Sequence, residues 1–332
     1  MALIALLIFV VLNERLFSYP SKAIPINLVK SWTYQIQGLE FSGAVEKLAL
    51  LDVDMLVVEP MATMTDIGDF DAKKMVTRLK DSSSTDPKYR KLVLAYVDIG
   101  QAEEWRLYFK DDWRPPTAFG PASPDFMIGE DPDGWAGNYP VAFWDTRWKG
   151  IIIYNTNVNN NVLNTILDLG FDGIYMDWVE AYDDEGVIKR GKRDGKDPAF
   201  EMVKFVGEIK KYARMRNADF LIVPQNAPYL IEDADGYLDV IDAIAQEDLS
   251  FSGGGDTDWD DPESGDVKTP RGSGEWCRGD LARVLLTYKN SGKPVFTVDY
   301  CISLKNTNEA WEYSLSKGFV PFVSRTPLDR IP

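Results

Sequence analysis

The sequence predicts a single (β/α)8 TIM barrel. Short apolar runs typical of buried parallel strands alternate with helical patterns along the chain. Most of these runs end in a polar or acidic residue, and no low-complexity linker divides them into two domains. A length of 332 residues suits eight βα units with some insertions, so we expect one large core.

The predicted strands are rich in β-branched and aromatic residues and are bounded by turn residues. They span residues 31–38, 54–60, 91–98, 171–177, 220–226, 243–247, 294–299 and 319–324. The predicted helices span residues 45–51, 70–80, 100–108, 148–169, 198–216 and 308–317. The Pro-, Gly- and Trp-rich stretch 113–139 is predicted to be a long functional loop. We interpret residues 140–145 as part of that insertion; if they formed a barrel strand, another strand would have to be removed from the eight.

The segment Gly170–Trp178 organises the rest of the chain. Its apolar residues predict a short buried strand, which follows a helix-ending glycine and stops at Asp177. The C-terminal ends of barrel strands face the active-site mouth, where an acid is more often catalytic than structural. Asp177 is therefore the first candidate for catalysis.

Nearly every predicted strand ends in a side chain that can accept or donate a proton, which indicates a carbohydrate site, although salt-bridged acids would also fit a structural protein. Sugars need many hydrogen bonds and an aromatic platform for their apolar faces. The strand-end residues are Gln35, Glu59, Asp98, Asp177, Gln225 with Asn226, Glu247, Asp299 and Ser324. The candidate platforms, each of which can equally be a packing residue, are Tyr96, Trp113, Trp135, Trp144, Trp178 and Tyr300.

Two facing carboxylates are the minimum equipment for cleaving a glycosidic bond. We predict Asp177 as the nucleophile of a retaining mechanism and Glu247 as the general acid and then base. Glu247 then needs a pKa raised by burial or by its neighbours. The reserve candidates Asp98, Asp299 and Glu59 are more suited to holding hydroxyl or amino groups of the sugar.

Composition excludes several other functions. The chain has no histidine, which rules out Ser-His-Asp triads, Cys-His pairs and the common His-containing zinc sites. Its 36 basic and 52 acidic residues give a net charge of −16, which argues against a nucleic-acid partner. This charge fits a solvated surface, or acidic loops that steer a cationic substrate to the mouth.

The N-terminal residues 1–23 predict export. Met1–Leu12 is almost wholly apolar and the small residues Ser21 and Ala23 follow, which suits a signal peptide; a short uncleaved membrane anchor is the alternative. We therefore expect a secreted or extracytoplasmic protein whose residues 24–332 form the barrel. Cys277 and Cys301 can pair in that compartment or remain buried thiols.

The acidic loop 253–266 fails the spacing test for an EF-hand calcium site, because Asp261 stands where the turn glycine belongs. We interpret it as a flexible acidic flap beside Glu247, with an irregular calcium site as the alternative. No metal site is predicted elsewhere.

Several phrases of the sequence resemble glycoside hydrolase family 114, the endo-α-1,4-polygalactosaminidase-like group. They are Trp32–Gly38, Ala95–Glu103, Phe143–Asp145, Gly170–Trp178, Gln225–Asn226 and Gln246–Asp248. The resemblance covers essentially everything after the leader, and the phrase ending at Asp177 is its most specific part. At Gln101 this sequence differs from the family pattern, which has an acid there.

This resemblance implies a TIM barrel, an exported enzyme, and cleavage of α-1,4-linked galactosamine-containing polysaccharide without a cofactor. It also implies that Asp177 and Glu247 are the acidic pair, and its motifs add Tyr34 and Asp145 to the expected substrate contacts. The alternative function is a non-catalytic barrel that binds carbohydrate at the same mouth.

Overall fold

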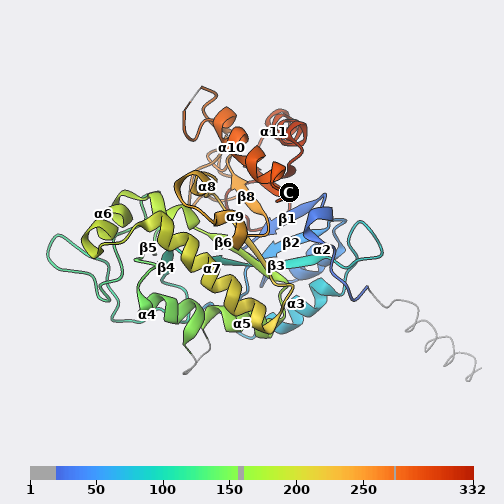
Figure 1. Cartoon of the computed structure of the whole chain (residues 1–332). Helices are drawn as coiled ribbons and strands as arrows, with labels where there is room; N and C mark the ends of the chain where they lie inside the picture. The colour runs from blue at the N-terminus through green and yellow to red at the C-terminus, as the bar shows by residue number, and fades with distance from the viewer. Residues whose placement is uncertain (1–19, 156–160, 273) are drawn as a thin grey trace, which may run out of the picture.

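The computed structural model describes residues 20–155, 161–272 and 274–332, and its framework is a barrel of parallel strands (Figure 1). In chain order these are β1 (Trp32–Gln35), β2 (Met55–Val58), β3 (Leu92–Asp98), β6 (Gly173–Asp177), β7 (Leu221–Pro224), β8 (Ile244–Glu247), β11 (Val295–Tyr300) and β12 (Val320–Ser324). A five-stranded part, β1-β2-β3-β6-β7, and a three-stranded part, β8-β11-β12, make up the sheet. A parallel bridge joins β7 to β8, and the Trp32 indole donates to Val320 O at 3.0 Å where β12 meets β1. The predicted TIM barrel is thus confirmed.

Helices lie along the outside of these strands, as Figure 1 shows for α7. They are α2 (Ala44–Leu50), α3 (Ala72–Lys80), α4 (Thr146–Lys149), α5 (Val162–Leu169), α6 (Glu185–Asp194), α7 (Pro198–Arg216), α8 (Leu230–Asp233), α9 (Tyr237–Val240), α10 (Arg278–Asn290) and α11 (Leu304–Lys317). The short elements are η1 (Ile26–Leu28), η2 (Gly150–Tyr154), η3 (Val179–Asp183), β4 (Gln101–Glu103), β5 (Asn138–Pro140), β9 (Phe251–Ser252) and β10 (Val267–Lys268). Local sequence sets the start of α7, because Pro198 occupies its first turn and the Asp197 side chain accepts the N–H of Ala199 at 3.1 Å.

Side chains alternate along each strand between the barrel interior and the surrounding helices. In β3, Leu94 and Tyr96 belong to the interior cluster, whereas Val93 and Val97 pack in the cluster beneath the helices. The interior also receives Phe296 and Val298 from β11. Because the period is two residues, this alternation decides which strand-end residues reach the mouth.

The predicted helix at residues 100–108 is wrong. The chain instead forms β4, which pairs antiparallel with β5 outside the barrel. The Asp98 side chain causes the turn, because its Oδ1 accepts the N–H groups of Gly100 and Gln101 at 2.9 and 2.8 Å. Residues 140–145 add no strand to the barrel, so the interpretation of that segment as an insertion is confirmed.

The predicted helix at residues 148–169 is interrupted. The structure has α4, then the π-helix η2, and then α5, with residues 156–160 outside the described part. The α5 helix begins anew at Asn161, whose side chain accepts the N–H of Asn164 at 2.7 Å. The last predicted helix is α11, which starts earlier than expected, after Ser303 caps its first turn.

Several other expectations concern the chain ends, the cysteines and the acidic loop. Residues 1–19 of the predicted leader lie outside the described residues. Within the described residues, no helix is long and apolar enough to cross a bilayer. Cys277 and Cys301 are both free thiols. The acidic loop folds against the C-terminal segment, where Thr257 and Thr326 share a hydrogen bond of 2.8 Å.

Candidate active site

The C-terminal ends of the parallel strands bring two predicted acids to one opening. Asp177 ends β6 and Glu247 ends β8, with β7 between them in the chain. Tyr175 and Ala245, two residues earlier on the same strands, belong to the interior cluster, so both acids occupy inward positions. The negative charge of Asp177 helps to raise the pKa of Glu247, after the larger effect of burial.

Asp177 is held by hydrogen bonds to both carboxyl oxygens. Tyr96 donates its hydroxyl to Oδ2 at 2.5 Å, and the Trp178 N–H donates to Oδ1 at 2.6 Å. Burial raises the pKa of Asp177, and these two hydrogen bonds oppose the rise by stabilising the charged form. The carboxylate is therefore fixed in orientation and stabilised where it faces the mouth.

The turn after Asp177 requires a glycine at position 100, in the connection that follows the neighbouring strand β3. Trp178 has left-handed backbone geometry (φ 47°), which turns the chain directly into η3. Its carbonyl oxygen would lie 2.3 Å from a Cβ placed on Gly100, so only glycine fits there. Gly100 thus permits the close approach that positions Asp177 and the residues after it.

Glu247 receives hydrogen bonds from three side chains. The Gln225 amide and the Asn226 amide donate to Oε2, the latter at 2.8 Å, and the Tyr300 hydroxyl donates to Oε1. Burial, followed by the charge of Asp177, raises the pKa of Glu247 to about 7, although the three donors lower it in part. Near neutral pH this carboxyl can both give and take a proton.

Tyrosines from the barrel interior connect the two acids. The Tyr34 hydroxyl donates to Gln225 Oε1 at 3.4 Å, and Gln225 in turn contacts Glu247. The Tyr34 ring lies 6.2 Å from that of Tyr96, which contacts Asp177. The predicted residues Tyr34, Tyr96, Gln225, Asn226 and Tyr300 are thus brought together around the acid pair.

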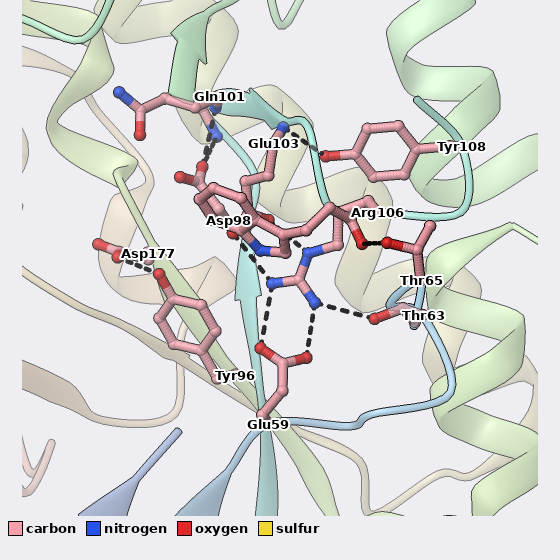
Figure 2. A network of polar contacts seen from close by, with 12 residues as sticks. Glu59, Thr63, Thr65, Tyr96, Asp98, Gln101, Glu103, Arg106, Tyr108 and Asp177 are labelled. Atoms are coloured by element: carbon pink, nitrogen blue, oxygen red, sulfur yellow. Dashed lines mark hydrogen bonds and ion pairs between the residues drawn. The ribbon is translucent and has the colours of Figure 1, made fainter. Parts of the chain in front are cut away.

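Glu59 is placed in a buried ion-pair network beside the mouth (Figure 2). Arg106 donates to Glu59 Oε1 at 2.6 Å and to Glu103 Oε2 at 2.6 Å, and it reaches Thr63 Oγ1 at 3.0 Å. Glu59, Glu103 and Arg106 are each only 3% exposed. Glu59 therefore holds Arg106 in this structure rather than presenting a free carboxylate for a sugar.

Asp98 lies between this network and Asp177. It is the register partner of Asp177 across β3 and β6, and Figure 2 shows it between the network and the Tyr96–Asp177 pair. Burial raises the pKa of Asp98 well above its usual range, and the charges of Glu103 and Asp177 add to the effect. Its hydrogen bonds to two backbone N–H groups shape the turn into β4.

Two strand-end residues point away from the mouth. Asp299 follows Val298 of the interior cluster, so its side chain faces outward, where Oδ1 accepts the N–H groups of Ser250 and Phe251 at 2.5 and 2.9 Å. Gln35 likewise follows the inward Tyr34, and its amide donates to the carbonyls of Gln37 and Asp329 at 3.0 Å each. Both residues support neighbouring segments, so the structure does not place them with the other expected substrate contacts.

The structure also shows the surroundings of Ser324 and of the Phe143–Asp145 motif. Ser324 is inward, 2% exposed, and its hydroxyl has no partner among the described residues. The Trp144 indole donates to Asp194 Oδ2 at 3.1 Å, and Asp145 caps α4 through the Arg147 N–H at 2.8 Å. These last two side chains are engaged with α6 and α4, and neither contacts the acid pair.

The predicted aromatic platforms divide into core and exposed residues. Trp113 is 8% exposed and packs on Phe126, and Trp178 is 7% exposed and packs over Gly100, so both are mainly core residues. Trp135 is 37% exposed and lies against Gly255 of the acidic loop. Of these three tryptophans, Trp135 is the most exposed.

Sequence reasoning missed three charged residues close to the acid pair. Glu103 and Arg106 fell in a segment predicted as helix, so their side chains had no assigned role. Glu180 follows Asp177 by three residues, and the charges of Asp177 and Glu247 both act on its carboxyl. The sequence signal for Glu180 was a second acid in the loop directly after the strand that ends at Asp177.

The site shows no arrangement for a metal, and one large cavity lies elsewhere. Among the described residues, no group of three or more Cys, Asp and Glu side chains is arranged to hold a metal ion. A cavity of about 770 Å³ is lined by residues that include Leu107, Trp113 and Asn161, none of which contacts the acid pair. The groups that contact the acid pair are the phenols of Tyr96 and Tyr300 and the amides of Gln225 and Asn226.

Comparisons with known proteins agree with this architecture. An uncharacterized protein, MJ1477, of Methanocaldococcus jannaschii is 30% identical over 313 residues, which cover 90% of this chain and 77% of that protein. An uncharacterized protein of Deinococcus radiodurans is 30% identical over 239 residues, which cover 72% of this chain and 66% of that protein, just under two thirds of its length.

Two solved structures share the fold. Ega3 from Aspergillus fumigatus, solved in complex with galactosamine, has a TM-score of 0.60 at 14% identity and covers 95% of this chain and 98% of its own. The glycoside hydrolase domain of PelA from Pseudomonas aeruginosa has a TM-score of 0.58 at 15% identity and covers 91% of this chain and 97% of its own. The profile of glycoside hydrolase family GH114 matches residues 20–331. The chain therefore belongs to glycoside hydrolase family GH114, as its sequence motifs predicted.

Proposed function

We propose that this protein hydrolyses α-1,4-linked galactosamine-containing polysaccharide with retention of configuration. The observation that carries the proposal is the pair of inward carboxyls, Asp177 and Glu247, whose surroundings suit different roles. Glu247 has a pKa raised to about 7, which suits an acid that gives up a proton near neutral pH. Asp177 receives two hydrogen bonds that stabilise its charged form, which suits a nucleophile.

The proposed reaction has two steps. In the first, Asp177 forms a bond to the anomeric carbon while the glycosidic C–O bond breaks and Glu247 donates its proton to the leaving oxygen. In the second, Glu247 takes a proton from water as the water oxygen attacks the anomeric carbon, and the bond to Asp177 breaks. Tyr300, Gln225 and Asn226 keep the Glu247 carboxyl oriented through both steps.

Family membership and the acidic mouth support the choice of substrate. The Ega3 structure, which shares this fold, was solved with galactosamine. A net charge of −16 favours the approach of a polymer that carries ammonium groups. Export, with residues 1–23 as a signal peptide or short anchor, is part of the proposal on the basis of the apolar run Met1–Leu12, and N-terminal sequencing of the mature protein tests it.

Wild type, Asp177→Asn and Glu247→Gln should be incubated with a panel of polysaccharides, and mass spectrometry of the released oligomers should score cleavage. We expect the wild type to shorten galactosamine-containing polymers and each variant to lose at least about 10³-fold in rate. Asp299→Asn is the matched control, because this strand-end acid faces away from the mouth, and it should keep cleavage. NMR of the products should first show new reducing ends whose anomeric configuration is the same as that of the cleaved linkage.

Two outcomes would count against the proposal. Full activity of both Asp177→Asn and Glu247→Gln would show that cleavage needs neither carboxyl of the acid pair. Tight binding of every polymer without any shortening by the wild type would instead identify a carbohydrate-binding barrel.

A further inference from the structure

The regular strand pairing of the barrel is interrupted between β7 and β8, and this interruption separates the two proposed catalytic acids. Asp177 belongs to the five-stranded part of the sheet, and Glu247 belongs to the three-stranded part. The strands β6 and β7 pair over four residues, whereas a bridge of Gln225 to Ala245 joins β7 to β8. A retaining mechanism needs its two carboxyls about 5–5.5 Å apart, so the contacts that join β7 to β8 matter for the reaction.

Pro224 explains why the ladder between these strands is incomplete. Backbone groups of successive residues in a parallel strand face alternate neighbours, and the Gln225 N–H donates to Met176 O of β6 at 2.8 Å. Pro224 and Asn226 therefore face β8, where proline has no N–H to donate. The Asn226 N–H donates to Ala245 O at 3.1 Å, and the chain then turns away from the strand, since Asn226 has left-handed geometry (φ 57°).

The Asn226 side chain takes the place of the ladder at this point. Its Oδ1 accepts the backbone N–H of Glu247 at 2.7 Å and the Gln246 amide at 3.2 Å, and its Nδ2 donates to Glu247 Oε2 at 2.8 Å. The two donors on Oδ1 fix the direction of the amide, so Nδ2 must face the carboxyl. One side chain at the end of β7 thus holds both the main chain and the carboxyl group of Glu247.

Asparagine suits this position because it combines three properties. Together with aspartate, it adopts left-handed geometry more readily than most residues that have a side chain. Its amide offers an acceptor for the backbone N–H and a donor for the carboxylate at the same time. Aspartate lacks the donor, and glycine lacks both groups. Replacement by either residue therefore removes a defined part of the contact and leaves the backbone conformation accessible.

We propose that Asn226 is a positioning residue that locks β8 to β7 and thereby fixes Glu247 relative to Asp177. The inference rests on the proposed function and adds the residue that holds the two acids at their working distance. Loss of this lock lets β8 move and carries Glu247 with it, so the chemical step suffers more than substrate binding. A misplacement of about 1 Å in a catalytic group can cost about 10²-fold in rate.

The test compares wild type with Asn226→Gly and Asn226→Asp. Glycine keeps the left-handed backbone but removes both side-chain contacts. Aspartate keeps an acceptor for the Glu247 N–H but places a carboxylate against the Glu247 carboxyl. Asn217→Gly and Asn217→Asp are the matched controls, because Asn217 precedes β7 at the opposite end of the barrel and its side chain accepts the Asp219 N–H at 3.2 Å.

Two measurements are made on each protein. The first is kcat and KM for galactosamine oligomers across a range of pH. The second is hydrogen–deuterium exchange of a peptide that contains Glu247, read by mass spectrometry, which reports on the lock without any need for catalysis.

We expect Asn226→Gly to lower kcat by about 10²-fold, to leave KM within about threefold of the wild-type value, and to speed exchange at Glu247 by about tenfold. Asn226→Asp should keep wild-type exchange, and its added negative charge should move the basic limb of the kcat/KM profile to higher pH. Both Asn217 variants should match the wild type. Wild-type kcat and exchange in Asn226→Gly would overturn the proposal, as would exchange in Asn226→Asp that is as fast as in Asn226→Gly.

The two proposals fail separately. If the wild type does not cleave the oligomers, the proposed hydrolysis fails, and exchange at Glu247 still decides whether Asn226 holds β8. If a thermal melt shows that Asn226→Gly is unfolded, Asn226→Asp decides the role of Asn226. An unmoved basic limb in Asn226→Asp, or exchange about tenfold faster than in the wild type, would then reject the assignment.

Discussion

Replacing Arg106 with methionine should destabilise the protein strongly at neutral pH. Arg106 forms ion pairs with Glu59 and Glu103 at 2.6 Å each, and all three side chains are 4% exposed. Methionine fills a similar volume but leaves two carboxyls buried without a cation. Breaking a buried ion pair by removing one partner typically costs about 3–5 kcal/mol.

The pH dependence of that loss follows from the carboxyl of Glu59. Burial already raises the pKa of Glu59, and Arg106 opposes this rise, so removal of Arg106 raises it further. A buried glutamate escapes its charge by taking up a proton, which costs about 4 kcal/mol at pH 7 but only about 1 kcal/mol at pH 5, from an unfolded pKa near 4.3. We therefore expect a deficit of about 3–5 kcal/mol at pH 7 that shrinks to about 1–2 kcal/mol at pH 5.

Urea unfolding followed by tryptophan fluorescence at the two pH values measures this deficit. Arg283→Met is the control, because Arg283 pairs with Glu232 and Asp280 at an exposed site and its loss should cost less than about 1 kcal/mol at either pH. An Arg106→Met deficit as small as that of the control, or one that does not change between pH 7 and pH 5, would refute the electrostatic reasoning.

Two further predictions concern the acid pair. Tyr300→Phe removes a donor that lowers the pKa of Glu247, so this pKa should rise above its value of about 7. Glu247 acts first in its protonated form, so the basic limb of the kcat/KM profile should move to higher pH; an unmoved limb would exclude Glu247 as the acid that this profile reports. Gly100→Ala places a methyl group against the carbonyl of Trp178, and the resulting shift of Asp177 should lower kcat by about 10²-fold. Circular dichroism should show that the barrel is retained, and wild-type kcat in this variant would contradict the predicted clash.

Most of the barrel was predictable because its information is local. Each strand is a short apolar run bounded by turn residues, and the glycine before residues 171–177 ends α5 as C-cap in left-handed geometry. The positions of Asp177 and Glu247 at strand ends followed from the same pattern. The helix predicted at 100–108 failed because the Asp98 side chain accepts the backbone N–H groups of Gly100 and Gln101 and turns the chain into β4, and no periodicity encodes these contacts.

The sequence by itself determined the eight strands, their order along the chain and the acids that end two of them, since all of this depends on residues adjacent in the chain. It did not determine which strand-end side chains face the mouth, because strands covered by helices are apolar on both faces and the two-residue period is hidden. Only the tertiary structure turned Gln35 and Asp299 outward. It also paired Glu59 with an arginine 47 residues away, because the partners of buried charges come from distant parts of the chain.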